Sequence, residues 1–432
     1  MYDMKRLADL VKSLEDQLVV CMRCGMCQAV CPIFAETGRE ADVARGKLAL
    51  LDGLLKEMFK DPRGVSERLS RCLLCGSCEA NCPSGVKVLD IFLKARVILA
   101  GYMGLSPVKK AVFRGMLARP EFFDRLLHSA TMIQKLFLVP ADDFQGLSCA
   151  RFSIPGLERS VKPLADVSFR ESTGALLPKT GSGLRAGFFV GCVIDKIYPG
   201  IGRAVVKALE HNGVSVYMPG EQGCCGIPAL ASGDIETFGK LVRYNLERFD
   251  PRDFDFLVTA CATCTSTIKK LWPRFSDSLS EREKSQIMEL TQKTMDISQF
   301  LVDRAHIGPA PSSGAVERKI LTYHDPCHLK KSLGIAAQPR ILLGLNPAYD
   351  FREMNEADRC CGCGGSFNLQ YYPISAAIGR RKLDSILESG CSTVATSCPA
   401  CMMQISDMLS GTGRRIEVKH AVEIYAEAIE NS

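Results

Sequence analysis

The sequence lacks several features that mark common protein classes. It has one tryptophan, only 7% aromatic residues, and no uninterrupted apolar run of the roughly 18 residues that a membrane-spanning helix needs. Its first twenty residues carry acidic side chains where a secretory signal has an apolar stretch. A cytoplasmic protein is therefore expected, in contact at most with the inner face of the cytoplasmic membrane. The balance of 47% hydrophobic and 24% charged residues excludes a disordered or fibrous chain.

What the chain has in excess is cysteine, with 21 residues among 432. Many thiols in a long chain of a reducing compartment are most simply metal ligands. The formal net charge of +6 is uneven, because residues 101–187 supply +5 of it. A local basic excess favours a docking surface for a partner or for lipid headgroups, and it argues against nucleic-acid binding. Lys109, Lys110 and Arg114 are candidates for such a surface, although a solvated helix face is the more common role.

The first of two internal duplications lies in the N-terminal quarter. It repeats a run of four cysteines, C-x2-C-x2-C-x3-C-P, with every cysteine offset by 51 residues. Apolar residues at a helical period precede and separate the copies, so the runs are expected in loops between helices. In the bacterial ferredoxin pattern three thiolates hold one face of a cubane, and the fourth cysteine ligates the other cluster. We therefore predict one [4Fe–4S] cluster at Cys21, Cys24, Cys27 and Cys82, and another at Cys72, Cys75, Cys78 and Cys31.

Structural zinc is the alternative for these runs. Zinc needs four thiolates per tetrahedral site and commonly draws them from two separated CxxC pairs. Two tight four-cysteine runs that each end in proline fit that pattern badly, so iron–sulfur clusters are favoured.

The second duplication covers the C-terminal half. A cysteine is followed after 31 or 32 residues by a Cys-Cys-Gly block, and after a further 34 or 35 residues by a CxxC pair. Alternating strands and helices predict a parallel sheet in each half, with the cysteines at the carboxyl ends of the strands. The expected strands are Phe188–Val190, Phe256–Thr259, Leu321–Tyr323 and Ser392–Thr396, and the helices include Ile201–Glu210 and Ala376–Leu387.

Five thiolates converge on each of these two sites. Adjacent cysteines cannot both reach one corner of an ordinary cubane, so the pattern suggests one or two open, non-cubane [4Fe–4S] clusters. The alternatives are a buried group of thiols, or one cubane with a spare cysteine. Cys363 is a further thiol whose ligation stays open, and Cys149 and Cys391 are expected to be ordinary core or surface thiols. The predicted ligands are Cys192, Cys224, Cys225, Cys261 and Cys264 in the first half, and Cys327, Cys360, Cys361, Cys398 and Cys401 in the second.

Histidines and glycines offer fewer candidates. His324 and His328 flank Cys327, and a hydrogen-bonded structural pair is favoured over a role beside the cluster. The pair Gly181-x-Gly183 precedes a predicted strand, where a dinucleotide-binding loop would follow one. We therefore expect neither a flavin nor an NAD site in this chain.

These features predict a fold class and a domain plan. An N-terminal α-helical ferredoxin domain is followed by two duplicated α/β domains with parallel sheets, and a helical extension with a linker lies between. The expected boundaries are 1–100 for the ferredoxin domain, 101–184 for the extension and linker, and 185–315 and 316–432 for the two cysteine-rich domains.

The two duplications together resemble a known family. The Cys-Cys-Gly halves resemble the cysteine-rich (CCG) domains of heterodisulfide reductase. The whole chain, over residues 15–405, resembles the glycolate oxidase iron–sulfur subunit and related lactate-utilisation proteins. The segments that carry the resemblance are CMRCGMCQAVCP, the D-x-x-R-G of Asp42–Gly46, RCLLCGSCEANCPSGV, FVGCV, CCGIPA, HDPCHL and CCGCGGSF.

The resemblance implies an iron–sulfur electron-transfer subunit of a 2-hydroxyacid (lactate or glycolate) dehydrogenase complex. Electrons would come from a separate FAD-containing subunit and leave through the CCG domains to an acceptor such as a quinone, so the chain alone is expected to lack dehydrogenase activity. A heterodisulfide-reductase-like subunit that cleaves a disulfide at a non-cubane cluster is the rival interpretation. A scaffold or sensor whose clusters only hold the fold is a third. The D-x-x-R-G segment and the fused domain order favour the first.

Overall fold

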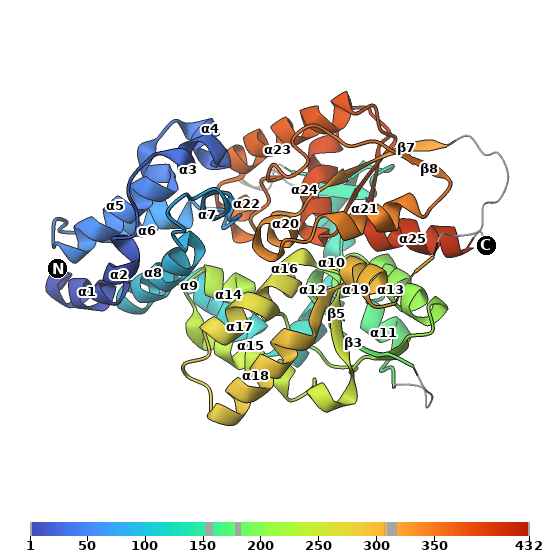
Figure 1. Ribbon diagram of the computed structural model, residues 1–432, viewed down its shortest axis with the longest axis horizontal. Coiled ribbons are helices and arrows are strands. Elements are labelled where there is room, and N and C mark those ends of the chain that lie inside the picture. The colour runs from blue at the N-terminus through green and yellow to red at the C-terminus, as the bar shows by residue number, and fades with distance from the viewer. Residues whose placement is uncertain (1, 152–158, 178–182, 306, 309–317, 431–432) are drawn as a thin grey trace.

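The chain folds into a helical part and two α/β units. The N-terminal helices lie beside the α/β units, of which one comes from the middle of the chain and one from its C-terminal third (Figure 1). The boundary expected at residue 315 and Gly181, one of the two glycines considered for a nucleotide loop, lie outside the described residues. The computed structural model describes residues 2–151, 159–177, 183–305, 307–308 and 318–430.

Three helices form the core of the N-terminal part. They are α1 (Met4–Val11), α5 (Ala44–Leu55) and α8 (Val88–Met103). Their apolar residues, which repeat at a helical period, are fully buried at Leu7, Val11, Leu51, Leu54 and Ile91. Shorter elements complete this part: η1 (Lys12–Leu14), α2 (Glu15–Leu18), α4 (Pro32–Thr37), η2 (Glu40–Asp42) and α6 (Arg63–Ser70).

Each ferredoxin-like cysteine run enters a short helix. Gly25 and Gly76 adopt positive φ angles of 90° and 74°, which glycine tolerates without strain, and each glycine starts a helical turn within its run. The prediction that the runs lie wholly in loops is therefore wrong in this detail. The two turns, α3 (Met26–Val30) and α7 (Ser77–Ala80), pack against each other.

The middle of the chain builds a four-stranded parallel sheet. Its strands are ordered β4 (Ser215–Tyr217), β3 (Arg185–Phe188), β5 (Phe256–Thr259) and β6 (Thr294–Asp296). The prediction of β5 is confirmed residue for residue, whereas β3 begins and ends earlier than the predicted strand. The helices of this unit are α12 (Cys192–Lys196), α13 (Pro199–His211), α14 (Ile227–Ala231), α15 (Ile235–Leu246), η4 (Pro251–Asp253), α16 (Ala262–Ser266), η5 (Thr267–Leu271), α17 (Trp272–Arg274), α18 (Glu281–Lys293) and α19 (Ile297–Asp303).

The C-terminal third repeats the same sheet. The order is β8 (Tyr349–Phe351), β7 (Lys319–His324), β9 (Thr393–Thr396) and β10 (Glu417–His420), again all parallel. The duplicated α/β architecture predicted from the cysteine spacing is thus confirmed. The helices are α20 (Cys327–Leu333), α21 (Ala337–Gly344), α22 (Ser366–Gln370), α23 (Tyr372–Glu388), α24 (Pro399–Leu409) and α25 (Ala421–Glu430).

The two sheets face each other at their carboxyl ends. Directly after β5, the backbone N–H of Ala262 donates a hydrogen bond of 3.1 Å to the carbonyl of Ser397, which directly follows β9. On another side α25 packs against α13, where Asn212 donates to the Tyr425 hydroxyl at 2.9 Å. Because parallel sheets present ligands at their carboxyl ends, this junction brings both sets of cysteines to one region.

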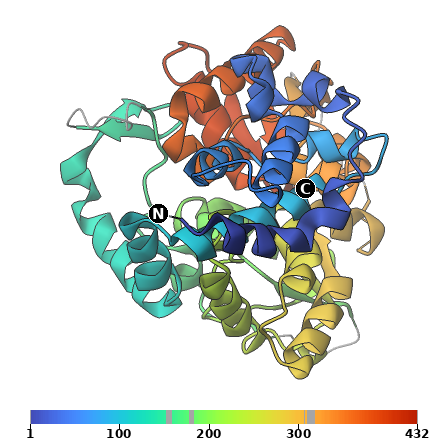
Figure 2. The ribbon, with the colours of Figure 1, turned by 90° about the vertical axis from the view of Figure 1, so that its left-hand side faces the viewer.

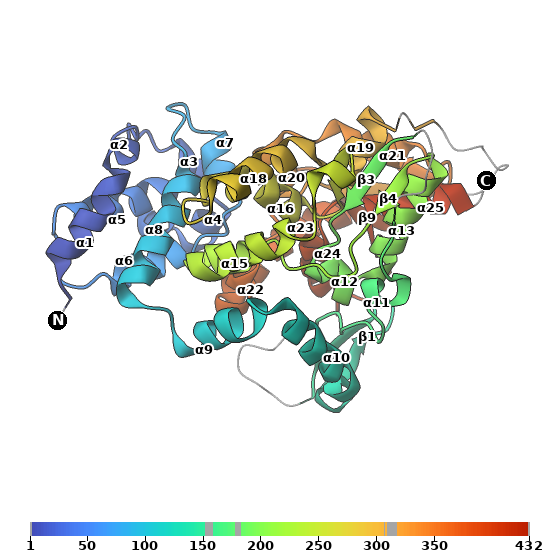
Figure 3. The same cartoon turned by 90° about the horizontal axis from the view of Figure 1, so that it is seen from below.

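The segment between the helical part and the first sheet forms an arm along one side of the molecule (Figure 2 and Figure 3). Ser106 caps its first helix, as its Ser-Pro sequence predicts. The antiparallel hairpin of the arm is not predicted from the sequence. No helix in the described part of the chain is both long and apolar enough to span a bilayer. The arm contains α9 (Pro107–Lys110), η3 (Ala111–Leu117), α10 (Pro120–Phe137), β1 (Leu138–Asp142) and β2 (Leu147–Ala150), and α11 (Phe169–Thr173) follows it.

Candidate iron–sulfur sites

The first group of thiols lies in the helical part. Burial raises the pKa of the Cys27 thiol, whereas the backbone N–H of Arg45 and its guanidinium charge oppose that shift. Cys24 is exposed. One hollow is lined by Cys21, Cys24, Cys27 and Cys82, and Cys78 also borders it. The fourth cysteine of the second run thus lies with the first three of the first run, which the crossed ferredoxin pattern requires.

The second group of thiols lies deeper. Burial, together with the neighbouring thiols of Cys75 and Cys72, raises the pKa of Cys31 to about 11. Cys78 is partly buried and has Cys72, Cys75 and Cys31 among its neighbours. Here the fourth cysteine of the first run meets the first three of the second run.

The D-x-x-R-G segment supports the first group. A Cβ at Gly46 would come within 2.0 Å of the Glu40 carbonyl, so only glycine fits. Arg45 pairs with Glu40 at 2.6 Å and donates to the Arg23 carbonyl at 3.3 Å, which holds the chain that carries the first cysteines. Asp42 is buried and pairs with Arg68 at 3.3 Å. The motif therefore ties the start of α5 to the first cysteine run.

A partly buried arginine, which the sequence did not single out, supports the second group. Arg96 on α8 donates to the carbonyls of Leu69 at 2.6 Å and Cys72 at 2.9 Å. Its other terminal nitrogen donates to the Ala231 carbonyl in the first α/β unit at 2.7 Å. The sequence does not indicate this role of Arg96, because the residues whose carbonyls it contacts are far away in the sequence.

The third group of thiols lies at the carboxyl ends of the first sheet. Cys192 begins α12 after β3, and its sulfur lies 4.0 Å from that of Cys224. The backbone N–H of Gly226, at a φ of 93°, donates to the Cys224 sulfur at 3.5 Å. Hydrogen bonds from the thiols of Cys224 and Cys264 lower the pKa of Cys225 well below its usual value. Cys261 follows β5 and hydrogen-bonds to Cys264.

The fourth group repeats this arrangement at the second sheet. The sulfurs of Cys361 and Cys401 are 3.5 Å apart, and the N–H of Gly362 donates to the Cys360 sulfur at 3.5 Å. Cys327 hydrogen-bonds to Cys360, and Cys398 to Cys401. Among the remaining cysteines, Cys363 follows this block and burial raises its pKa. Cys149 lies in the hairpin strand β2, and Cys391 is buried near β9, where its thiol contacts the Ile386 carbonyl.

Contacts between thiols also join the groups. Cys75 and Cys360 belong to one buried cluster, which connects the second and fourth groups, and the neighbouring Cys360 thiol raises the pKa of Cys75. The hydrogen bond between Ala262 and Ser397 brings Cys261 beside Cys398, which connects the third and fourth groups, and the Cys261 thiol lowers the pKa of Cys398. An unbroken series of neighbouring thiols therefore runs from the helical part through the second sheet to the first sheet.

The two histidines beside Cys327 differ from each other. His328 is hydrogen-bonded at both ring nitrogens, to the Thr263 hydroxyl at 3.0 Å and the Leu74 carbonyl at 3.3 Å, so the expected structural role is confirmed for it. For His324 the expectation of a satisfied ring is wrong. It is fully buried, yet neither ring nitrogen has a hydrogen-bond partner among the described residues, because the end of β7 directs the ring toward the thiols of Cys361 and Cys401.

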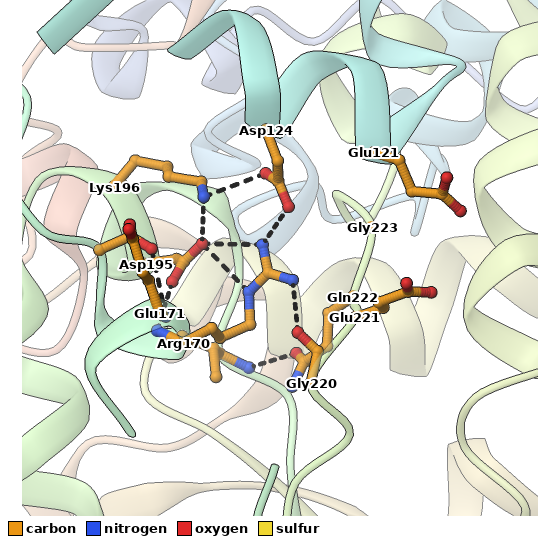
Figure 4. Close-up of polar contacts among 12 residues, drawn as sticks. Glu121, Asp124, Arg170, Glu171, Asp195, Lys196, Gly220, Glu221, Gln222 and Gly223 are labelled. Atoms are coloured by element: carbon orange, nitrogen blue, oxygen red, sulfur yellow. Dashed lines mark hydrogen bonds and ion pairs between the residues drawn. The ribbon is translucent and has the colours of Figure 1, made fainter. Parts of the chain in front are cut away.

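A small cavity lies beside Cys192 and Cys224. Its volume is about 20 Å³, and α10 closes it with Pro120, Phe123 and Asp124. Ion pairs hold this closure: Arg170 contacts Asp195 at 2.8 Å and Asp124 at 2.9 Å, and Lys196 contacts the same two carboxylates at 3.0 and 3.1 Å (Figure 4). These charged residues were not singled out from the sequence, since only the fold brings them together.

The donor set of the four groups fits iron–sulfur clusters. All 21 cysteines are free thiols. The eighteen predicted ligands lie in four groups, and Cys363 lies beside the fourth of these groups. Thiolates are the ligands that such clusters require. The two unpaired nitrogens of His324 are a further sign that the fourth group surrounds something other than protein, because buried polar atoms in folded proteins nearly always have partners.

Comparisons with known proteins agree with this chemistry. A model of the 4Fe-4S dicluster domain matches residues 17–86, and a model of the cysteine-rich domain CCG matches residues 186–269 and 321–406. A probable glycolate oxidase iron–sulfur subunit of Bacillus subtilis is 27% identical over 99% of this chain and 98% of its own length. A subunit of the fumarate reductase (CoM/CoB) of Methanothermobacter marburgensis is 29% identical over 91% of this chain and 68% of its own length. Lactate utilization protein A of an Exiguobacterium species is 32% identical over 56% of this chain and 98% of its own length.

Proposed function

Because the chain belongs to the family of glycolate oxidase iron–sulfur subunits and lactate utilisation proteins, we propose that it is the electron-transfer subunit of a 2-hydroxyacid dehydrogenase complex. In this proposal a partner FAD subunit oxidises lactate or glycolate, and this chain conducts the electrons to an acceptor such as a quinone. A partner is expected because the chain offers thiol groups suited to electron transfer and no predicted nucleotide loop. Bound iron–sulfur clusters would supply one-electron transfer.

The proposal assigns the eighteen thiols to four clusters. Cys21, Cys24, Cys27 and Cys82 would hold one [4Fe–4S] cubane, and Cys72, Cys75, Cys78 and Cys31 the other. The two five-thiol groups would hold one non-cubane cluster each. The gathering of thiols at the described distances supports this assignment, as does the crossing of the fourth cysteines between the two runs.

One observation carries the proposal, namely the contact of thiols between groups. Cys75 meets Cys360, and Cys261 meets Cys398, although these residues are far apart in sequence. Thiols that pack only as small apolar side chains do not need to lie beside the thiols of another group. A scaffold role, in which the clusters only hold the fold, would leave these contacts between the thiol groups unexplained.

Basic side chains hold the backbone around the second group of thiols. Arg96 fixes the backbone of Cys72, and buried Lys47 donates to the carbonyls of Asp42 and Arg71, so two cations stand near the second group. Neighbouring cations favour the deprotonated thiolate that binds metal. The exposed Cys24 and the cavity beside Cys192 mark the two ends of the series.

The test uses the full chain with reconstituted iron and sulfide, without oxygen. Alone, it is expected to oxidise neither lactate nor glycolate with an artificial dye. Addition of an FAD-containing 2-hydroxyacid dehydrogenase and its substrate should bleach the visible iron–sulfur absorption, and a soluble quinone should restore it. Cys75→Ser should abolish this response, whereas Cys149→Ser, in the hairpin, should not. Stoichiometric flavin in the isolated chain, or hydroxyacid oxidation without the flavoprotein, would contradict the proposal.

A second candidate function rests on the likeness to the fumarate reductase (CoM/CoB) subunit. In that alternative a five-thiol site reduces a disulfide of two thiol coenzymes. The cavity beside Cys192 has a volume of about 20 Å³, which is space for roughly one water molecule, so a disulfide substrate would require α10 to move away. Release of free thiols from a mixed coenzyme disulfide by the reduced chain would favour this alternative over the first.

A further inference from the structure

The two cysteine-rich halves differ at the position three residues before the first cysteine of each half. His324 lies three residues before Cys327, and Phe189 lies three residues before Cys192, the matching cysteine of the first half. The Phe189 ring packs among aromatic rings, with its centroid 5.7 Å from that of Phe249 and 6.4 Å from that of Trp272. The first half therefore has an inert ring where the second half has an imidazole.

The imidazole of His324 is buried without a protein partner. Its exposure is 0%, and both ring nitrogens lack hydrogen bonds among the described residues. A nitrogen of this ring and the sulfurs of Cys361 and Cys401 all lie within 4.8 Å of one another. Because folded proteins seldom leave such a group unpaired, the ring is expected to bond to whatever the two cysteines hold.

The other polar groups near the ring are already engaged. The Asp325 carboxylate accepts two hydrogen bonds of 2.9 Å from Arg340. The Lys382 ammonium donates to the carbonyls of Glu356 and Ala357 and has no acceptor to offer. The Ala357 carbonyl, which also lies near the ring, already accepts hydrogen bonds from the Asp325 N–H at 3.0 Å and from Lys382 at 3.3 Å. The sulfurs of Cys361 and Cys401 are the other acceptors in front of the ring.

We propose that His324 donates an N–H hydrogen bond to a sulfur of the cluster held by Cys327, Cys360, Cys361, Cys398 and Cys401, and thereby makes the second CCG site easier to reduce than the first. The inference rests on the proposed function, since it requires a cluster at that site. Hydrogen bonds to sulfur are among the factors that determine the potential of an iron–sulfur cluster. Reduction adds negative charge, and a hydrogen bond to a more negative acceptor is stronger, so the donor favours the reduced state. Phe189 supplies no donor to the first site. His324 is in this sense a positioning residue that acts on the cluster.

The test compares variants of the full, cluster-loaded chain by iron analysis and by a redox titration followed by electron paramagnetic resonance. His324→Phe copies the residue of the first half. It should leave the iron content unchanged and shift one couple to lower potential. A tenfold lower ratio of reduced to oxidised cluster at a fixed potential corresponds to about 59 mV for a one-electron couple. His324→Gln, which keeps an N–H donor, should shift that couple less. His211→Phe, an exposed control at the end of α13, should shift none.

A spectroscopic measurement keeps the proposal testable if a variant fails to fold. In the unaltered chain labelled with ¹⁵N-histidine, the reduced second site should show a weak nitrogen coupling together with an exchangeable proton. A strong nitrogen coupling would overturn the proposal, because it would make His324 an iron ligand. Unchanged potentials in a fully loaded His324→Phe chain would also overturn it and leave a packing role. If the unaltered chain holds only the iron of two cubanes, the proposed function itself fails at the CCG sites, and iron analysis reveals this before any variant is made.

Discussion

The two cysteine-rich halves share a sheet and a thiol skeleton but not the groups beneath the thiols. At the ends of matching strands the first half has Phe189 and Asp296, whereas the second has His324 and His420. In α15 of the first half, Val242 lies three residues after Gly239 and is buried. In α23 of the second half, Lys382 lies three residues after Gly379 and is only 1% exposed. Near the thiols, the second half thus has nitrogen-bearing side chains at positions where the first half has Phe189, Asp296 and a valine.

This difference shows how a duplicated site becomes two unlike sites. The sheet and the Cys-Cys-Gly turn determine where the sulfurs lie, and both halves retain them. The neighbouring charges and donors determine how readily each site accepts an electron. Burial lowers the pKa of Lys382 to about 8, while the thiols of Cys361 and Cys360 oppose that shift, so the two kinds of group act on each other.

Loss of a thiol from each half should have the largest effect. Two cubanes account for about eight iron atoms and two further four-iron clusters for about sixteen in total. Cys225→Ser and Cys361→Ser should each reduce the iron content of the anaerobically loaded chain to about twelve atoms, whereas Cys149→Ser should not reduce it. A loss in only one variant would show that one half holds a cluster. Contents near eight in every chain would remove the CCG clusters from the proposed function.

The glycines of the two Cys-Cys-Gly turns provide the next test. Gly226 and Gly362 have φ angles of 93° and 92°, which cost a residue with a side chain roughly 1–2 kcal/mol. A Cβ at Gly362 would also lie 2.6 Å from the Ser375 backbone carbonyl, whereas at Gly226 it would lie 2.7 Å from the Phe238 ring, which can shift. Gly362→Ala should therefore lower the thermal midpoint more than Gly226→Ala. Equal midpoints would mean that the two turns tolerate the change alike.

The contributions of Asp296 and His420 to folding stability should depend on pH in opposite ways, and these residues end matching strands of the two halves. Burial raises the pKa of Asp296 to about 7, above its unfolded value, so its contribution to stability is full below about pH 4 and is lost as the pH rises through 7. The loss is at most about 4 kcal/mol. Burial lowers the pKa of His420 to about 4, so its contribution instead grows between about pH 4 and 6.5.

Asp296→Asn should accordingly raise the thermal midpoint at pH 8 but change it little near pH 4. The control is Asp277→Asn, an exposed carboxylate of the same half, which should leave the pH profile as it is. All chains must carry the same iron content for this comparison. A midpoint of Asp296→Asn that is lower than that of the unaltered chain at both pH values would show that the carboxylate stabilises the fold in its charged form.

The smallest effect is expected at the arm, which covers the cavity of the first half. Arg114, one of the expected docking residues, pairs with Asp234 at 3.4 Å and Glu236 at 3.1 Å and so belongs to the fold. Lys110, Arg119, Arg125 and Lys135 form no ion pair among the described residues, and α10 exposes Phe122, Leu126, Ile133 and Phe137 beside them. An amphipathic helix with free cations is suited to an anionic lipid surface or an acidic partner.

Charge reversal at Lys110, Arg125 and Lys135 together should weaken recovery of the chain with anionic phospholipid vesicles several-fold. The effect should fade with salt, since exposed charges are screened over about 10 Å at 0.1 M. Reversal of Arg414 and Arg415, exposed on the second half, is the matched control. Unchanged recovery in both variants would leave the arm as a solvated face.

The sequence by itself determined the features that depend on neighbouring residues. The cysteine spacings within each run, the turn glycines and the strand patterns act over a few residues, so the ferredoxin part, the duplicated sheets and the thiols of each half could be predicted. The strand Phe256–Thr259 and the Ser106 cap agree with the structure because hydrophobic periodicity and capping are local.

Only the tertiary structure decided how these parts face each other. Nothing in the pattern indicates that Cys75 meets Cys360, that Arg96 reaches Ala231, or that α10 closes the cavity beside Cys192, because each contact joins segments far apart in sequence. His324 is the clearest case: its spacing from Cys327 is the same whether its ring is satisfied or not. Its two free nitrogens result from the packing of β7 against the segments that carry Cys361 and Cys401. How distant segments pack against each other cannot be read from the pattern of neighbouring residues.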